Sequence, residues 1–150
     1  LAAELNRLSA DFADGGLRPA VDDLPALLGR LRSAGLALGV ATNDGEAAAH
    51  SHLAEAGVLA LFDCVLGADS GYGPKPGPGM LDAFCAATGQ AAAEVAMVGD
   101  GVHDLAMRRH GAGWAIGVLT GLATEADLGP HADVVLPSIG DLPGWLGLDQ

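Results

Sequence analysis

Short apolar runs that alternate with helical patterns are the feature that most restricts the fold of this chain. Four of these runs occur in "LALGVATND", "EVAMVGD", "WAIGVL" and "ADVVLP", and a fifth covers Cys64–Leu66. Helical patterns separate them at about residues 23–34, 46–56 and 80–87, and a further helix is expected to begin near Val102. Strands that alternate with helices at this spacing predict a parallel sheet with helices on both faces. We therefore expect an α/β domain of the Rossmann-like kind.

The charge balance of the 150 residues limits the partners that the chain can have. There are 19 acidic residues against 7 basic ones, and the net charge is −12. Binding to nucleic acid or to an anionic membrane surface needs clustered Lys and Arg, so we expect neither partner. No apolar run approaches the roughly 18–20 residues that span a bilayer, and the charge suits a cytoplasmic protein. Cys64 and Cys85 lack the spacing of a zinc site and are expected to be core thiols.

Polar residues follow three of the expected strands. Thr42 and Asn43 follow the first strand, Lys75 lies in the loop after the second, and Asp100 and Asp104 follow the third. In parallel α/β sheets, ligands bind where the carboxyl ends of the strands open into loops. We therefore expect these side chains to share one site.

Several of these residues also have a purely structural explanation. Thr42 could cap the helix that begins near Glu46, and Asp104 in a first helical turn is favoured by the helix dipole. A lone lysine in a loop is usually solvated, although Lys75 stands between two prolines. Asp100 is harder to explain, because a carboxylate between glycines at the end of an apolar strand has little structural purpose.

Taken together, the same residue types suit phosphoryl transfer. Mg²⁺ takes hard oxygen ligands and keeps several waters, so one or two carboxylates are enough to hold it. A transferring phosphoryl group needs positive charge and hydrogen-bond donors around its oxygens. Lys75 supplies the charge, the Thr42 hydroxyl is a donor, and main-chain N–H groups of the loops supply the others. A nucleophile is the part that is missing.

The ordered segments "GVATND", "GPKPGPG" and "VAMVGDGVHDLAM" resemble motifs two, three and four of the haloacid dehalogenase-like (HAD) phosphohydrolases. The later "GVLTGLATEADL" and "HADVVLPSIGDLPGWL" resemble the phosphoglycolate phosphatase-like branch, and the resemblance runs from about Leu17 to the C-terminus. It implies that Thr42, with Asn43, binds the phosphoryl oxygens. Lys75 would offset the charge of nucleophile and phosphate. Asp100 would ligate Mg²⁺, and Asp104 would ligate it through water or support the groups around it.

The first motif of that family, an apolar strand that ends in Asp-x-Asp, is the exception. Its first aspartate is the nucleophile that forms an aspartyl-phosphate, and its second is the general acid–base. The nearest segment, "DFADGGL", places Phe12 where the nucleophile belongs, and no apolar strand precedes it. In this branch the first motif lies upstream of an inserted helical cap. We therefore interpret residues 1–18 as the end of the cap, with residues 1–12 helical, and a linker. Residues 19–150 are interpreted as the HAD-like core of an N-terminally incomplete chain.

The resemblance thus implies a Mg²⁺-dependent hydrolase of a small phosphorylated metabolite that works through an aspartyl-phosphate on an upstream aspartate. We expect the 150 residues alone to be inactive and unstable, because a missing central strand would expose apolar faces and unpaired backbone groups.

Three alternatives to this function have weaker support. A non-catalytic binding or regulatory module of the same fold is favoured by the absent nucleophile. A dehalogenase of the same fold needs no magnesium, so the acidic pair Asp100 and Asp104 argues against that activity. A P-type ATPase phosphorylation domain has an asparagine where His103 stands. His103 itself is a candidate contact of the phosphate or of the groups around the metal.

Overall fold

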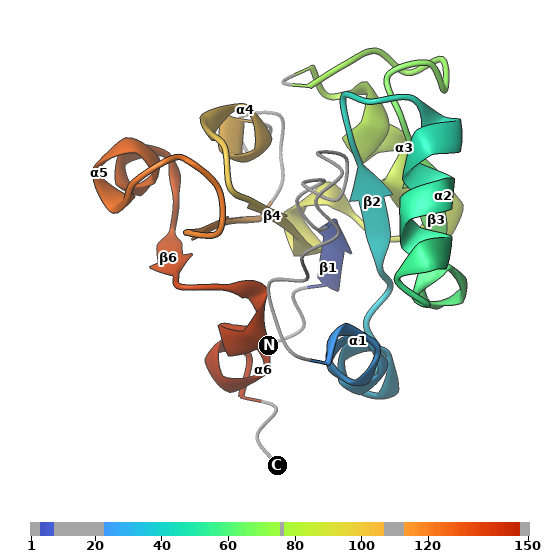
Figure 1. Cartoon of the computed structure of the whole chain (residues 1–150). Coiled ribbons are helices and arrows are strands. Elements are labelled where there is room, and N and C mark those ends of the chain that lie inside the picture. Colours follow the sequence, from blue (N-terminus) through green and yellow to red (C-terminus); the bar gives the residue numbers. More distant parts are fainter. Residues whose placement is uncertain (1–3, 8–22, 76, 107–112, 148–150) are drawn as a thin grey trace.

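Parallel strands at the centre of the fold carry the apolar runs of the sequence (Figure 1). The computed structural model describes residues 4–7, 23–75, 77–106 and 113–147. Its strands are β1 (Glu4–Arg7), β2 (Gly39–Ala41), β3 (Cys64–Leu66), β4 (Val95–Gly99), β5 (Trp114–Val118) and β6 (Val134–Leu136). One sheet has the order β1-β4-β5-β6, and a second consists of β2 and β3, with β2 lying beside β1. Every pairing is parallel, so within each sheet the carboxyl ends of the strands share one edge.

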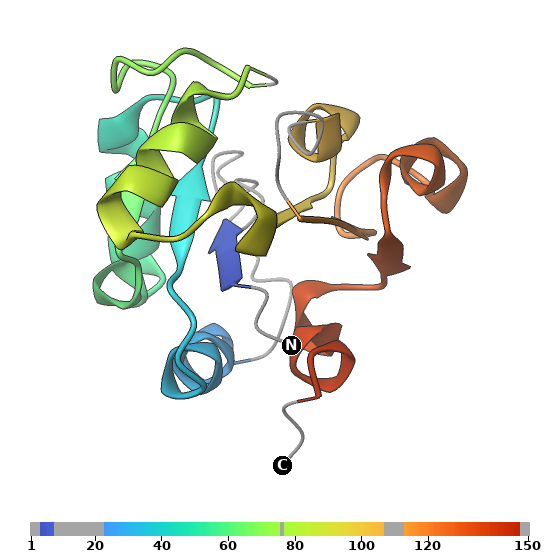
Figure 2. The same cartoon turned by 180° about the vertical axis from the view of Figure 1, so that it is seen from behind.

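Helices cover both faces of the strands, as the opposite views of Figures 1 and 2 show. They are α1 (Leu24–Ser33), α2 (Glu46–Glu55), α3 (Gly79–Thr88), α4 (Val102–Leu105), α5 (Glu125–Leu128) and α6 (Leu142–Trp145), with short 3₁₀ turns between them. Helix α1 forms as expected. Its N-cap Asp23 accepts a hydrogen bond from the Ala26 N–H at 3.1 Å, and its buried leucines, spaced three and four apart, form one face.

The alternation of side chains along β4 explains the two layers of helices. Ala96 and Val98 belong to a core cluster that includes the leucines of α1 and Leu142 of α6. Val95 and Met97, which point to the opposite face, pack with Leu81 and Phe84 of α3 in a second cluster. A third cluster joins α4 and α5 to β5. The predicted α/β architecture with helices on both faces is confirmed.

The helix predicted for residues 1–12 is wrong at positions 4–7, which form β1. This strand pairs with β4 so that Glu4 lies opposite Val95, and the register shifts between Leu5 and Arg7. Every residue of β4 is buried, so backbone groups along its edge need a partner, which β1 provides. Residues 1–3 and 8–18 of the predicted helix end and linker lie outside the described residues.

No strand in the described ranges ends in Asp-x-Asp, the sequence of the first motif. β2 is also shorter than the apolar run that contains it. It begins at Gly39 because the Leu38 N–H and carbonyl are bonded to Asp63, at 2.9 and 2.7 Å, rather than to a strand. Among the helices that the structure describes, none has the length and apolar character needed to cross a membrane.

Candidate active site

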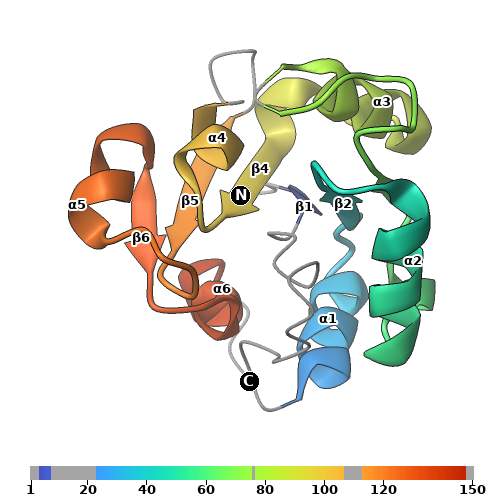
Figure 3. The ribbon, with the colours of Figure 1, turned by 45° about the horizontal axis from the view of Figure 1, so that its top comes forward.

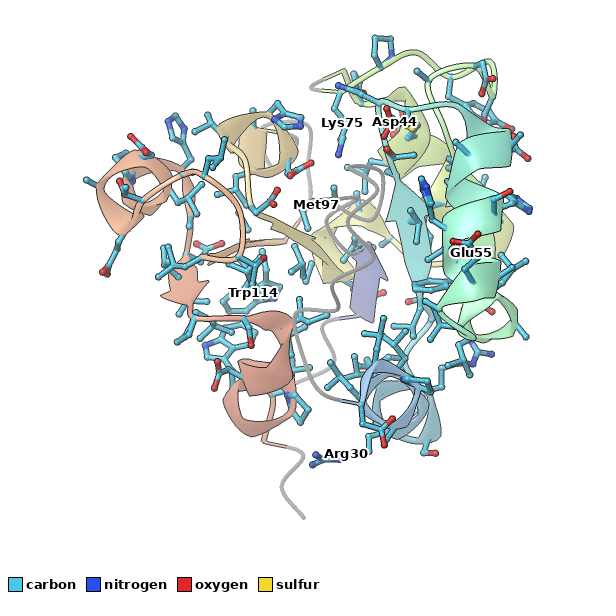
Figure 4. The ribbon with its side chains drawn as sticks, in the orientation of Figure 1. Arg30, Asp44, Glu55, Lys75, Met97 and Trp114 are labelled. Carbon is cyan, nitrogen blue, oxygen red and sulfur yellow. The ribbon has the colours of Figure 1, made fainter. Side chains whose placement is uncertain are left out.

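The predicted site residues lie in the loops that follow β2, β3 and β4 and in the first turn of α4. Figure 4 shows Lys75 and Asp44 near one another at one edge of the strands, with Met97 within β4 and Trp114 lower in the view. Lys75 lies on the loop between β3 and α3, and Asp44 on the loop between β2 and α2. This is the edge at which ligands of parallel α/β sheets bind.

Thr42 directly follows β2 and is almost completely buried, with 2% of its surface exposed. Its N–H donates to the Leu66 carbonyl of β3 at 3.0 Å, which extends the strand pairing by one residue. Its hydroxyl oxygen accepts a hydrogen bond from the Asp44 N–H at 3.0 Å. A hydroxyl has one proton to donate in addition to its lone pairs, so this bond orients the group and leaves the O–H for another acceptor.

The structural explanation for Thr42, that it caps α2, does not apply. Helix α2 has Gly45 at its N-cap position and no capping bond from that residue's side chain. The first N–H group of the helix, that of Glu46, instead donates to Asp69 Oδ1 at 2.8 Å. Asp69 comes from the loop after β3 and therefore ties that loop to the start of α2.

Asn43 holds the main chain of Lys75 from both sides. Its side-chain Oδ1 accepts from the Lys75 N–H at 2.7 Å, and its Nδ2 donates to the Lys75 carbonyl at 3.3 Å. The two bonds join the loop after β2 to the loop after β3. A role of Asn43 in binding phosphate stays a prediction, whereas its contact with Lys75 is a feature of the structure.

Lys75 is buried and pairs with Asp104, so it is not the solvated loop lysine that its position in the sequence would suggest. The two side chains are 3% and 1% exposed, and Lys75 Nζ donates to Asp104 Oδ1. Removing one member of such a buried pair leaves the other charge without compensation, which typically costs about 3–5 kcal/mol. The pair links the loop after β3 to helix α4, which follows β4.

The Asp104 carboxylate has contacts on both oxygens. Oδ2 accepts from the Gly101 N–H at 3.3 Å, which ties the first turn of α4 to the residue before it. Oδ1, besides meeting Lys75, lies 3.6 Å from Nε2 of His103, whose side chain is 48% exposed. Gly99, at the end of β4, packs against this carboxylate so closely that a Cβ there would overlap it.

Asp100 directly follows β4 and is partly exposed, unlike Asp104. No group of three or more His, Cys, Asp or Glu residues is arranged to hold a metal within the part of the chain that is described. Asp100 and Asp104 nevertheless match what Mg²⁺ needs from a protein, which is one or two carboxylates with water completing the coordination. The donor set therefore fits a hard cation better than zinc, which prefers nitrogen and sulfur ligands.

The two cysteines stand apart from this arrangement. Burial, with a smaller contribution from Asp63, raises the pKa of the Cys64 thiol to about 11. Burial and then Asp82 also raise the pKa of Cys85. Both pack against the cluster of α3 and β4, as expected for core thiols.

Contacts therefore connect Asn43 and Lys75, from the loops after β2 and β3, with Asp104 of α4, while Thr42 and Asp100 directly follow β2 and β4. Sequence reasoning missed Asp69 and also Gly121, whose backbone lies against the Asp100 carboxylate. No local sequence pattern points to either residue, because each one contacts a residue that is far away in the sequence.

Comparison with known proteins supports the fold and identifies the family. The model of the family described as haloacid dehalogenase-like hydrolase matches residues 1–111. The chain is 38% identical over 118 residues to the probable phosphatase IndB of Dickeya dadantii, covering 78% of this chain and 51% of that protein. It is 34% identical over 126 residues to the phosphoglycolate phosphatase of Rhodospirillum rubrum, covering 83% and 52%. The chain thus spans about half the length of these curated relatives.

Solved structures show the same fold. A predicted phosphoglycolate phosphatase from Haemophilus somnus superimposes with a TM-score of 0.76 at 21% identity, covering 89% of this chain and 61% of that one. A putative phosphoglycolate phosphatase from Lactobacillus delbrueckii gives a TM-score of 0.73 at 25% identity, covering 83% and 52%.

Proposed function

The chain belongs to the haloacid dehalogenase-like hydrolases, and we propose that it forms the core of a Mg²⁺-dependent phosphatase that acts on a small phosphorylated metabolite. The observation that carries this proposal is the buried Lys75–Asp104 pair at the edge where Thr42 and Asp100 end their strands. Relatives that are 38% and 34% identical carry the names of phosphatases, which supports the same conclusion. The acidic composition also suits the cytoplasm.

In this proposal the three loops divide the work of binding a phosphoryl group. Thr42 donates a hydrogen bond from its hydroxyl group to a phosphoryl oxygen. The group is oriented for this bond because its oxygen already accepts from the Asp44 N–H. Lys75 brings positive charge to an otherwise water-poor position, where charge stabilisation is stronger than in water. Asn43 keeps the Lys75 main chain in place and has an exposed edge that can also face the phosphate.

Asp100 and Asp104 are the residues that would hold Mg²⁺. When bound, the ion supplies positive charge that neutralises the phosphoryl oxygens. Asp100 is the more exposed carboxylate and would contact the ion directly. Asp104 is almost fully buried and bonded to Lys75 and Gly101, so it would act through water and by fixing the lysine.

The nucleophile in this mechanism is an aspartate of an Asp-x-Asp strand outside the described residues. Its carboxylate attacks phosphorus and displaces the alcohol of the substrate, which takes a proton from the second aspartate. The second aspartate, now a carboxylate, then takes a proton from the water that attacks the acyl-phosphate at phosphorus, which releases inorganic phosphate and restores both aspartates. Phosphoglycolate is the substrate to test first, because one relative is named a phosphoglycolate phosphatase.

A second candidate function is a non-catalytic module of the same fold. It is favoured by one observation, namely that none of the described strands ends in Asp-x-Asp. The buried lysine argues against it, because a buried charged pair costs desolvation energy that a structural module could avoid with apolar side chains.

The test is turnover of a generic aryl phosphate and of phosphoglycolate by the full-length protein, with and without Mg²⁺. Asp100→Asn should lower Mg²⁺-dependent turnover on the order of 10²–10³-fold, the scale of losing one group that stabilises transition-state charge. Asp82→Asn makes the same chemical change at an exposed position of α3 and should turn over like the wild type. Equal activity of the two variants would refute the metal assignment, and no turnover by the wild type on any phosphomonoester would favour the non-catalytic module.

A further inference from the structure

The loop between β5 and α5 lies beside the end of β4, where Asp100 is located (Figures 1 and 3). The contact is made by Gly121. A Cβ atom at this position would lie 2.8 Å from Asp100 Cγ and 3.1 Å from Asp100 Cβ, with the carboxylate Oδ2 nearer still. Since these separations are shorter than van der Waals contact, a side chain at residue 121 has no room while the Asp100 carboxylate keeps its present position.

Glycine is favoured at residue 121 by the lack of space for a side chain and not by the backbone conformation. The glycines with positive φ include Gly35, Gly57 and Gly89, but Gly121 is not among them, so its backbone conformation is open to any L-residue. Gly129, in the same connection between β5 and β6, has nothing within 4 Å of the position of a Cβ. Close approach is therefore a property of Gly121 and not of glycines in this connection generally.

An added methyl group at residue 121 would act on the Asp100 carboxylate. The three nearest atoms all belong to the Asp100 side chain, and the two closest, Oδ2 and Cγ, move when that side chain rotates, whereas β4 behind it is buried along its whole length. The carboxylate would therefore move before the strand does. Gly99 lies equally close to the second carboxylate, because a Cβ at residue 99 would overlap the side chain of Asp104.

We propose that Gly121 is a positioning residue, which holds the carboxylate of Asp100 in the orientation that binds Mg²⁺. This inference rests on the proposed function, because it takes Asp100 as a metal ligand. It adds the loop after β5 to the loops after β2, β3 and β4 that carry the site residues. Groups that support a metal ligand typically contribute about 10–100-fold to metal affinity, and the same range is expected here.

The experiment is calorimetric titration of the full-length protein with Mg²⁺ alone. The four proteins to compare are the wild type, Asp100→Asn, Gly121→Ala and Gly129→Ala. We expect Gly121→Ala to raise the Kd for Mg²⁺ about 10–100-fold and Gly129→Ala to leave it unchanged. Turnover at saturating Mg²⁺ should recover more fully in Gly121→Ala than in Asp100→Asn, because the ligand is displaced and not removed.

The outcomes separate this inference from the function on which it rests. If Asp100→Asn binds Mg²⁺ as the wild type does, the metal site itself is refuted, and the role of Gly121 falls with it. If Asp100→Asn loses binding while Gly121→Ala and Gly129→Ala bind equally, the metal site stands and the role of Gly121 is refuted.

A double variant keeps the contact testable if Gly121→Ala is too unstable to titrate. Asp100→Ala removes Oδ2 and Cγ, the two nearest atoms that the new methyl group would meet, and leaves only Asp100 Cβ, at 3.1 Å. The melting temperature of Gly121→Ala/Asp100→Ala should therefore lie close to that of Asp100→Ala alone, although Gly121→Ala by itself lowers it. Losses that simply add in the double variant would show that residue 121 does not act through Asp100.

Discussion

Replacing Lys75 by methionine should destabilise the protein far more than the loss of a surface ion pair would. Methionine fills a similar volume but cannot compensate the charge of Asp104, whose side chain is 1% exposed. Breaking a buried pair in this way costs about 3–5 kcal/mol of unfolding free energy. For a protein of this size, 1 kcal/mol lowers the melting temperature by about 2–4 °C, so a fall of about 6–20 °C is expected.

A second substitution should recover most of this loss. Asp104→Asn in the Lys75→Met background removes the unpaired charge but keeps a side-chain oxygen that can accept from the Gly101 N–H. Replacing both members of a buried ion pair by neutral groups is often close to neutral for stability. The double variant should therefore melt well above Lys75→Met, while both variants lack phosphatase activity because both lack the lysine.

The measurement is thermal unfolding of the full-length protein by calorimetry, with Arg32→Met as the matched control. Arg32 pairs with Asp63 at 2.8 Å, but these side chains are 37% and 32% exposed, so the pair should contribute only about 0–1 kcal/mol. If Lys75→Met and Arg32→Met lower the melting temperature equally, the burial of the Lys75–Asp104 pair has no energetic consequence. A double variant that melts no higher than Lys75→Met would refute the argument from an unpaired charge.

Two further predictions follow from individual contacts. Asn43→Ala removes both hydrogen bonds to the Lys75 main chain, so the free energy of unfolding should fall by about 1–3 kcal/mol and kcat should fall with it. Denaturant unfolding and steady-state kinetics test these two effects. An unchanged kcat would show that Asn43 does not position the lysine. With a pKa of about 11 instead of the usual 9.0, the Cys64 thiol should react with iodoacetamide at pH 8 about 100-fold more slowly in the native protein than in the unfolded one, as mass spectrometry would report. Because the raised pKa favours the neutral thiol in the folded state, its contribution to stability is present below pH 9 and is lost as the pH rises toward 11. Equal alkylation rates in native and unfolded protein would contradict the burial of this thiol.

Local sequence patterns were enough to predict the α/β architecture and to place the candidate site residues after the strands. Helix α1 needs only an N-cap aspartate at position 23 and leucines repeated on one face, and both signals lie within a few residues of one another. β3 occupies the predicted residues, Cys64–Leu66, because a short apolar run of this kind favours a strand. Thr42 and Asp100 were located for the same reason, since each directly follows such a run.

Contacts between distant parts of the chain were decided only by the tertiary structure. Residues 4–7 became a strand because the buried β4 offers an edge to pair with, and no local pattern reports that edge. A lysine between prolines is expected to be exposed, and only the fold brings Asp104, from helix α4, to its Nζ. The same holds for Gly121, whose lack of a side chain matters only because the end of β4 packs against it. Periodicity and capping act over a few residues, whereas burial and ion pairing depend on which loops the sheet brings to one edge.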